Sequence, residues 1–281
     1  MPIHRPCATL ALAIAIALPV TGHAHRSFLL PSATVVTPDQ KTHWITVDAA
    51  RSNELFSFNH NAMATEGLQI VSPDGSSSSP TKLERFRYRT VFDWQLTQEG
   101  TWQAAVVERG LRAEWVEDGK PKRWSGPAQD YERSVPRQAE KLSVSEVSSR
   151  VETFVTFGAP TAQRLTGSGL EALYGPHPNA LTAGRTSALR FQLDGKPAAG
   201  VKVQVLQGGA QHQTRAAPLE LQTDSEGRVL VQWKAPGMYW ISATLRQGSA
   251  TAPASQGTAS YVATVEVRPE STAVAAQRRA D

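Results

Sequence analysis

Residues 187–206 read SALRFQLDGKPAAGVKVQVL, and this stretch decides the fold class. Residues 187–193 and 200–206 each alternate apolar and polar side chains, which is the period of a half-buried strand. Between them, Asp194-Gly195 is a strong signal for a tight hairpin turn. Two short strands joined by such a turn indicate antiparallel β structure.

Similar short strands recur outward from this hairpin in both directions. Towards the C-terminus they are expected over residues 219–223, 228–233, 238–246 and 260–267. Towards the N-terminus they are expected over residues 42–49, 67–72, 85–96, 101–108 and 150–157. Short strands at this spacing, separated by turn signals, are typical of a β-sandwich. The sequence therefore predicts an all-β protein with two β-sandwich domains, the C-terminal one immunoglobulin-like or transthyretin-like.

The polar and Gly/Pro-rich segments between strands predict the domain boundaries. The N-terminal part is expected to contain a polar excursion at about residues 110–140 and a short helix over residues 138–150. The end of the chain has few apolar residues to bury, which favours disorder. The expected parts are a signal peptide (1–24), an N-terminal β-rich domain (25–165), a linker (166–180), a C-terminal sandwich (181–268) and a disordered tail (269–281).

The first 24 residues have the pattern of a secretory signal peptide. A cationic start precedes an apolar stretch at residues 8–20, and small residues stand before His25. Cleavage after Ala24, or alternatively after Gly22, would release an exported chain, for which we expect a periplasmic location. No second apolar stretch is long enough for a membrane span. The only cysteine, Cys7, lies in this segment, so thiolate chemistry and disulfides are excluded from the mature chain.

The composition and the motifs exclude several classes of protein. The chain has 281 residues, 40% of them apolar and 19% charged, which is an ordinary globular balance. Its net charge is only +4 and no long run of like charges occurs, so nucleic acid is not an expected partner. Common hydrolase and phosphate-binding motifs are absent. Residues 167–172 loosely fit a dinucleotide fingerprint, but Gly175-Pro176 would end the helix that it requires, so they are interpreted as flexible linker.

The histidines are the candidate ligands for a metal ion. Cleavage after Ala24 would make His25 the first residue, whose amine and imidazole can chelate one ion. A second imidazole would complete a three-nitrogen site that suits copper or nickel. His60 follows an aromatic run, and His177 is held between two prolines. A purely structural role for each of them stays open, and it is the role expected for His43 and His212.

Motifs spread over the chain resemble a known family of bacterial periplasmic proteins, "domain of unknown function 4198". The motifs are HRSFLLPS (25–32), WITVDAA (44–50), SN (52–53), FSFNH (56–60), PDG (73–75), FD (92–93), GT (100–101), GLE (169–171), HPN (177–179), GKP (195–197), TD (223–224) with Gly227, and GMYW (237–240). The resemblance covers nearly the whole chain after the expected signal peptide.

The resemblance implies a metal-related binding role in the periplasm. Members of the family are associated with nickel or cobalt uptake beside transporters, and some occur near outer-membrane receptors for metal chelates. The matched motifs carry four positions over as candidate metal-site residues: His25, His60, Asp48 and His177. The first hypothesis is therefore a non-enzymatic protein that binds nickel or cobalt, with copper as a further option. Its expected partners are a metal transporter or outer-membrane receptor components.

Two other functions stay open at this point. The chain is alternatively a periplasmic β-sandwich adaptor that docks a receptor or transporter and holds no metal of its own. It is alternatively a copper-binding protein, or a copper oxidoreductase, that uses an N-terminal histidine site. The sequence does not indicate an oligomeric state.

Overall fold

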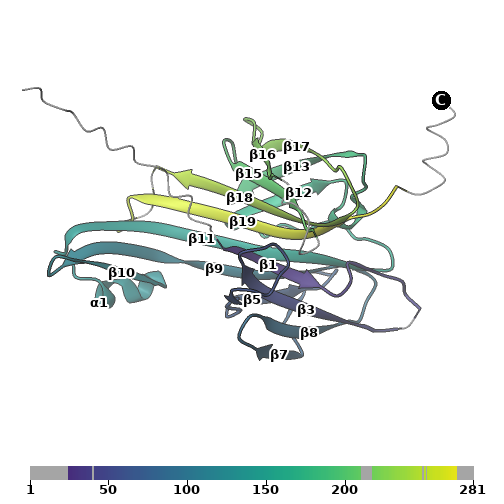
Figure 1. Cartoon of the computed structure of the whole chain (residues 1–281), viewed down its shortest axis with the longest axis horizontal. Coiled ribbons are helices and arrows are strands. Elements are labelled where there is room, and N and C mark those ends of the chain that lie inside the picture. Colours follow the sequence, from purple (N-terminus) through teal and green to yellow (C-terminus); the bar gives the residue numbers. More distant parts are fainter. Residues whose placement is uncertain (1–24, 40, 210–216, 249, 251, 271–281) are drawn as a thin grey trace, which may run out of the picture.

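A computed structural model describes residues 25–270, apart from residues 40, 210–216, 249 and 251. The expected signal peptide, His212 and nearly all of the expected disordered tail lie outside the described residues. The described chain is almost entirely β structure, arranged in three sheets (Figure 1). None of its helices is long and apolar enough to cross a bilayer.

The first sheet is five-stranded and antiparallel. Its order is β1-β3-β8-β7, and β4 pairs with the end of β3 beyond β8. The strands are β1 (Arg26–Pro31), β3 (His43–Ser52), β4 (Asn61–Ala62), β7 (Lys82–Arg85) and β8 (Thr90–Leu96).

The central sheet is ten-stranded and joins both halves of the chain. Its order is β16-β15-β18-β19-β11-β9-β5-β6, while β10 pairs with β9 and β2 with β11. The strands are β2 (Val35–Val36), β5 (Leu68–Val71), β6 (Ser77–Ser78), β9 (Gly100–Glu117), β10 (Lys120–Gly126), β11 (Glu140–Phe157), β15 (Lys202–Gln207), β16 (Leu219–Gln222), β18 (Gly237–Gln247) and β19 (Gln256–Val267). β11 and β19 lie side by side and pair in parallel, although they are far apart in the sequence.

The third sheet is four-stranded, and a few short helices complete the described structure. The sheet has the order β12-β13-β14, with β17 beside β13. Its strands are β12 (Leu170–Gly175), β13 (Thr186–Leu193), β14 (Lys196–Pro197) and β17 (Arg228–Gln232). The helices are η1 (Ala128–Asp130), α1 (Tyr131–Ser134) and η2 (Pro178–Ala180). Asp194 and Gly195 both have positive φ, 49° and 77°, so the predicted hairpin turn is confirmed.

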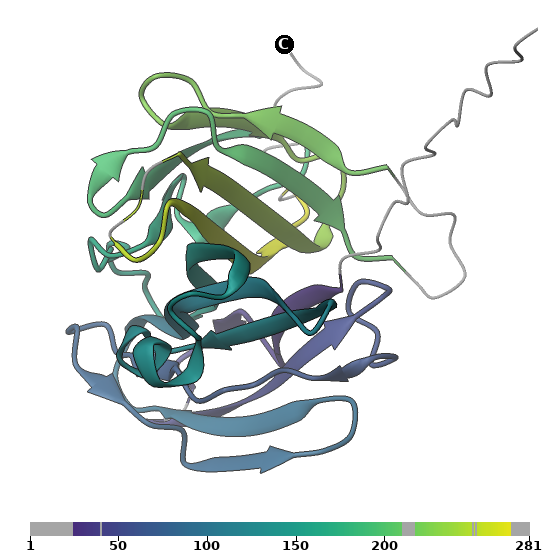
Figure 2. The same ribbon diagram turned by 90° about the vertical axis from the view of Figure 1, so that its left-hand side faces the viewer.

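The first and third sheets lie on opposite faces of the central sheet, as the side chains of β11 show. Val151, Val155 and Phe157 belong to the core that the central sheet shares with the first sheet. Phe154 belongs to the core shared with the third sheet. Successive strand residues point to opposite faces, so the central sheet is the middle of three layers (Figure 2). The all-β sandwich prediction is confirmed, with one sheet serving both sandwiches.

The predicted linker over residues 166–180 is wrong. It contains β12, which is hydrogen-bonded along β13, and the short helix η2. The predicted division into domains at residues 25–165 and 181–268 does not separate the sheets either, because β11 of the first domain pairs with β19 of the second. Glycines and prolines around Leu170–Gly175 suggested irregular chain. Pairing with β13, the next strand along the chain, makes this segment a strand.

The predicted loop and helix over residues 110–150 are also corrected. β9 continues to Glu117, turns at Asp118 and Gly119, and returns as β10. The expected helix over residues 138–150 is largely the first half of β11, which pairs with β9. The excursion is nevertheless packed by its aromatic residues, since the rings of Trp124 and Tyr131 meet edge to face at 6.0 Å between centroids.

Candidate functional site

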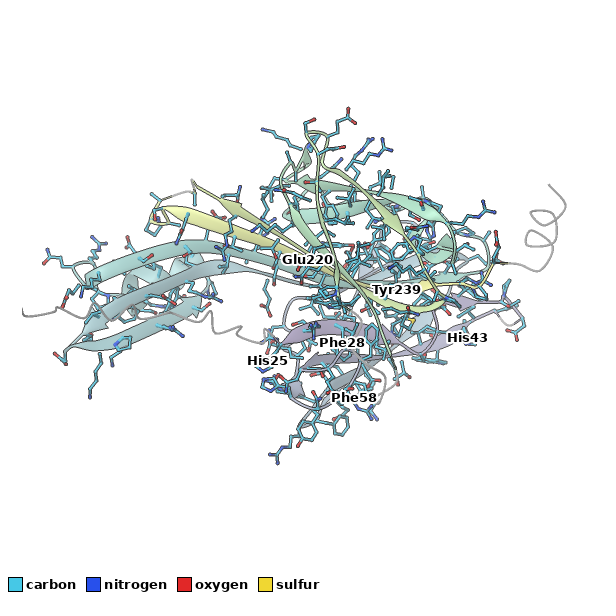
Figure 3. The ribbon with its side chains drawn as sticks, turned by 45° about the horizontal axis from the view of Figure 1, so that its top comes forward. His25, Phe28, His43, Phe58, Glu220 and Tyr239 are labelled. Carbon is cyan, nitrogen blue, oxygen red and sulfur yellow. The ribbon has the colours of Figure 1, made fainter. Side chains whose placement is uncertain are left out.

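The imidazole rings of His25 and His60 are stacked on each other. Their centroids are 3.5 Å apart and the planes differ by only 6°. His25 is exposed and His60 is half-buried. Figure 3 shows His25 at the edge of the first sheet, far from His43. Two of the predicted ligands are therefore brought together, although 35 positions separate them in the sequence.

The pairing of the strands explains this contact. β1 lies on one side of β3, with Arg26 opposite Ser52. β4 lies on the other side of β3, with Asn61 opposite Arg51. His25 directly precedes β1 and His60 directly precedes β4, so both residues flank the end of β3.

The loop between β3 and β4 is held in a compact form. The Oδ1 atom of Asn59 accepts a hydrogen bond from the Asn53 N–H at 3.1 Å and lies 2.7 Å from the Ser52 hydroxyl oxygen. The rings of Phe56 and Phe58 pack against Phe28 of β1, with centroids 5.3 Å and 6.1 Å away. These contacts fix the position from which His60 reaches His25.

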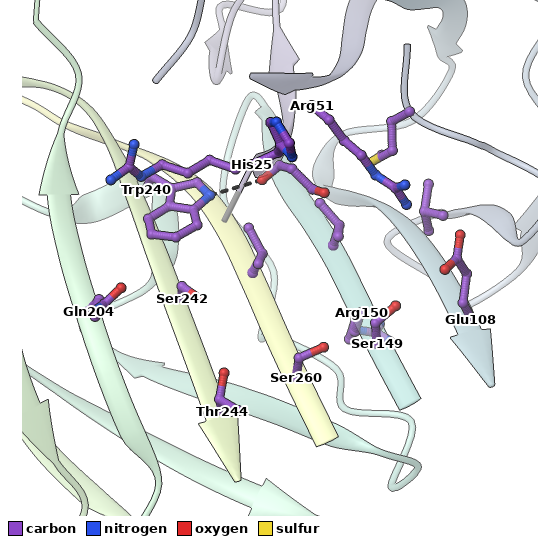
Figure 4. Close-up of a pocket in the computed structure, with 16 residues that line it drawn as sticks. His25, Arg51, Glu108, Ser149, Arg150, Gln204, Trp240, Ser242, Thr244 and Ser260 are labelled. Carbon is purple, nitrogen blue, oxygen red and sulfur yellow. Dashed lines mark hydrogen bonds between the residues drawn. The ribbon is translucent and has the colours of Figure 1, made fainter. Parts of the chain in front are cut away.

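Trp240 of β18 fixes the start of β1 on the central sheet. Its indole Nε1–H donates to the Ser27 carbonyl oxygen at 2.9 Å (Figure 4). The guanidinium of Arg26 lies 5.8 Å from the centre of the indole ring and donates to the Asn53 carbonyl oxygen at 3.1 Å. Trp240 thus positions the two residues that follow His25. In the sequence Trp240 stands out only as part of the GMYW motif, which does not predict a role for it at the site.

An open cleft of about 660 Å³ begins beside His25 and runs over the central sheet (Figure 4). Hydroxyl side chains line much of its floor, among them Ser242 and Ser260. Arg51 and Arg26 contribute positive charge, and Glu108 is the one carboxylate among the described residues that line it. The cleft therefore offers hydrogen-bonding groups next to the stacked imidazoles, but little negative charge to attract a bare cation.

Asp48 lies on the same strand as Ser52 but has another partner. Its carboxylate is 3.4 Å from the guanidinium of Arg89. Partial burial raises the pKa of Asp48, and the positive charge of Arg89 opposes that rise. Within the described ranges no group of three histidine, cysteine or acidic side chains is placed to hold a metal, so Asp48 does not complete such a set with the two histidines.

His177 has a structural environment in another part of the fold. Its Nδ1 accepts from the Asn179 N–H at 3.2 Å, and its Nε2 lies 3.0 Å from the Thr101 hydroxyl. Burial lowers the pKa of His177, and a hydrogen bond with the backbone of Thr161 partly offsets this. Since both ring nitrogens have partners, neither is directed at a metal. The prediction that His177 is a ligand finds no support in this arrangement.

Residues 167–172, which loosely fit a dinucleotide fingerprint, direct backbone N–H groups to a carboxylate of the same segment. The backbone N–H groups of Gly167 and Ser168 donate to the Glu171 carboxylate at 2.7 Å and 3.2 Å. The same carboxylate accepts from the Thr166 N–H at 2.9 Å. The donors that a phosphate would need are taken, and a strand follows where the fingerprint requires a helix.

The family of the chain follows from its sequence pattern. The pattern of the family described as "Domain of unknown function (DUF4198)" matches residues 22–247. The chain belongs to this family. The matching part of this DUF4198 chain includes His25, His60 and Trp240, whereas Ser260 of the cleft lies beyond it.

Comparisons with other proteins add no function. No curated protein matches the DUF4198 chain. Among solved structures, the D0-D1 domain of intimin is 13% identical, with 85% of this chain and 97% of that chain covered and a TM-score of 0.22. The chicken CNTN1 FN1-FN3 domains are 9% identical, with 86% and 97% covered and a TM-score of 0.24. At such TM-scores these likenesses carry no argument about this chain.

Proposed function

We propose that the protein binds a transition-metal ion through the imidazoles of His25 and His60. The contact between the two rings is the single observation that carries this proposal. In the proposed role the protein is exported to the periplasm and delivers nickel or cobalt, or alternatively copper, to an uptake system. The metal is cargo in this proposal and takes part in no reaction.

The donor set supports a borderline transition metal over a hard cation. Imidazole nitrogen suits nickel, copper and zinc, whereas magnesium and calcium prefer oxygen ligands. The basic residues Arg26 and Arg51 beside the site also disfavour ions that bind mainly by charge. If the chain is cleaved after Ala24, the new amine of His25 adds a third nitrogen, and the square plane that copper or nickel prefers then has one position left for water.

Metal binding requires a rotation of one ring. In parallel rings the nitrogen lone pairs point side by side, so they do not converge on one ion. His25 is exposed and its ring makes no hydrogen bond to the residues that the structure describes, so rotation about its side-chain bonds costs little. The backbone contacts of Asn59 and Trp240 hold the two Cα positions while the ring turns.

Calorimetric titration with Ni(II), Co(II) and Cu(II) tests the proposal. The protein should be exported through its own leader, and intact mass should establish its first residue. We expect one-to-one binding that falls in His25→Ala and His60→Ala by more than the roughly 10- to 100-fold typical of changes around the ligands. His43→Ala is the matched control, because His43 lies at the opposite end of β3.

The same titration separates the other functions. Unchanged binding in His25→Ala and His60→Ala would refute this site, and absence of binding by the wild type would favour the adaptor that holds no metal. An extra residue ahead of His25 should weaken binding if its amine is a ligand. Consumption of oxygen or reductant by the copper-loaded protein would instead favour the oxidoreductase.

A further inference from the structure

The hairpin formed by β7 and β8 carries exposed aromatic and basic side chains at its tip. Its turn reads Arg85-Phe86-Arg87-Tyr88-Arg89, and every residue from 81 to 89 is exposed. Leu83, Phe86 and Tyr88 are 42%, 58% and 43% exposed. Figure 1 places β7 at the outer edge of the first sheet, away from the central sheet.

The backbone of this tip is well fixed. The Phe86 N–H donates to the Arg89 carbonyl oxygen at 2.9 Å, which closes the turn. The Arg87 carbonyl oxygen accepts from the Ala62 N–H of β4 at 3.3 Å. Arg89 packs 4.7 Å above the Phe58 ring. Since the turn is held by these contacts, the outward aromatic rings of Phe86 and Tyr88 are not needed for its shape.

The charge around the aromatic rings is positive. Lys82, Arg85 and Arg87 lie in the hairpin and have no ion pair within the part of the chain that the structure describes. Glu84 is the one acidic residue between positions 81 and 89. Exposed apolar groups with this surrounding charge mark an interaction site for a negatively charged surface.

An acidic protein and an anionic bilayer are both negatively charged surfaces, and the shape of the tip favours one of them. A standard protein interface buries about 800 Å² on each partner, which requires a broad surface. The tip, closed by the hydrogen bond from Phe86 to Arg89, is small and suits a bilayer interface, where aromatic rings and basic side chains insert individually. We propose that this tip docks on an anionic phospholipid surface, with Phe86 and Tyr88 among the headgroups and Arg85 and Arg87 at the phosphates.

The proposed docking is independent of the metal site, although it places that site near the membrane. The tip contacts β4 through Arg87 and Ala62, and β4 begins directly after His60. A protein docked in this way would hold His25 and His60 close to the bilayer surface. Loss of metal binding would leave the docking proposal intact, and loss of docking would leave metal binding intact.

Co-sedimentation with vesicles tests the proposal. The full chain should bind vesicles of equimolar phosphatidylglycerol and phosphatidylcholine more tightly than vesicles of phosphatidylcholine alone. Each basic residue near an anionic surface contributes about fivefold, so Arg85→Gln/Arg87→Gln should lower the partition coefficient more than tenfold at low salt. Phe86→Ala/Tyr88→Ala should lower it as well, with little change in salt dependence.

Matched variants on the third sheet supply the controls. Arg190→Gln/Arg228→Gln removes the same net charge from two exposed, paired positions of β13 and β17. Leu230→Ala removes a side chain that is 52% exposed. Both should bind vesicles as the wild type does. An equal loss in the tip and control variants, or wild-type binding by the tip variants, would overturn the proposal. Equal wild-type binding to both kinds of vesicle would also overturn it and leave an acidic protein as the candidate partner.

Discussion

The indole of Trp240 donates its Nε1–H to the carbonyl oxygen of Ser27, across the junction between the central and first sheets. This hydrogen bond holds β1 two residues after His25. It links β18 of the central sheet to β1 of the first sheet. The position of the histidine therefore depends on a residue of the other half of the chain.

Trp240→Phe should weaken metal binding while the protein stays folded. Phenylalanine keeps most of the apolar contact with Phe28 and Ala50 but loses the donor. An acceptor left without its partner costs about 1–3 kcal/mol, so the free energy of unfolding should fall within that range. Metal affinity from titration should fall as well, because His25 loses its support. Trp44→Phe, at the exposed far end of the first sheet, should change neither quantity.

Asn59→Ala should weaken metal binding through the loop that carries His60. The variant removes the oxygen that accepts from Asn53 and contacts Ser52, so the loop gains freedom. Groups that orient a ligand typically contribute 10- to 100-fold in affinity, and we expect about tenfold here. Asn61→Ala is the control, since its exposed side chain makes no hydrogen bond within the described chain. Equal affinity of both variants would contradict this role of Asn59.

Local signals in the sequence predicted the strands well. The Asp194-Gly195 turn depends on neighbouring residues alone and was predicted correctly. The strand expected over residues 200–206 exists as β15, but it pairs with β16 and β18 in the central sheet, and the hairpin partner of β13 is β14. The first half of β11 was mistaken for a helix because Glu140–Arg150 is polar on a sheet face that is partly open. The shared central sheet depends on the parallel pairing of β11 with β19. No local pattern reveals a pairing between strands more than a hundred residues apart.

The candidate site was predicted in part for the same reason. His25 and His60 stood out by their chemistry and motifs, and their contact arises from two strands that flank β3. Asp48 and His177 came from motif positions, which carry no information about neighbours. The structure pairs Asp48 with Arg89 and gives both ring nitrogens of His177 partners.

Stability should fall as the pH is lowered, partly because of His177. Burial lowers the pKa of His177 in the folded chain, so below about pH 6.5 the unfolded chain binds a proton more readily than the folded chain. Stability is fully present above that pH and is lost as the pH falls towards the lowered pKa. Urea unfolding from pH 8 to pH 5 should show a flatter profile in His177→Gln. A wild-type slope in His177→Gln would contradict the prediction.

Arg150→Met should destabilise the interior between the central and third sheets. The Arg150 guanidinium lies 2.5 Å from the Glu152 carboxylate and 3.7 Å from that of Glu171, and all three side chains are at most 6% exposed. Removing one partner of a buried ion pair costs about 3–5 kcal/mol. Arg109→Met is the matched control, because its pair with Asp194 is exposed and should contribute about 0–1 kcal/mol. Chemical unfolding measures both losses, and similar small losses would contradict the prediction.

Gly110→Ala should disrupt the packing of β9 against the end of β10. An added Cβ at this position would lie 2.3 Å from the Gly126 carbonyl oxygen, so the backbone of one strand must move. Gly119→Ala is the informative comparison: its φ is +71° but nothing lies within 4 Å of an added Cβ. The free energy of unfolding of Gly119→Ala should fall by about 1–2 kcal/mol, which is the cost of a left-handed conformation in a residue with a Cβ. Gly110→Ala should lose more stability and also change the near-ultraviolet circular dichroism, because Trp124 packs on Tyr131 at this end of β10. Equal losses in the two variants, with unchanged aromatic signals, would show that the end of β10 adapts to the added methyl group.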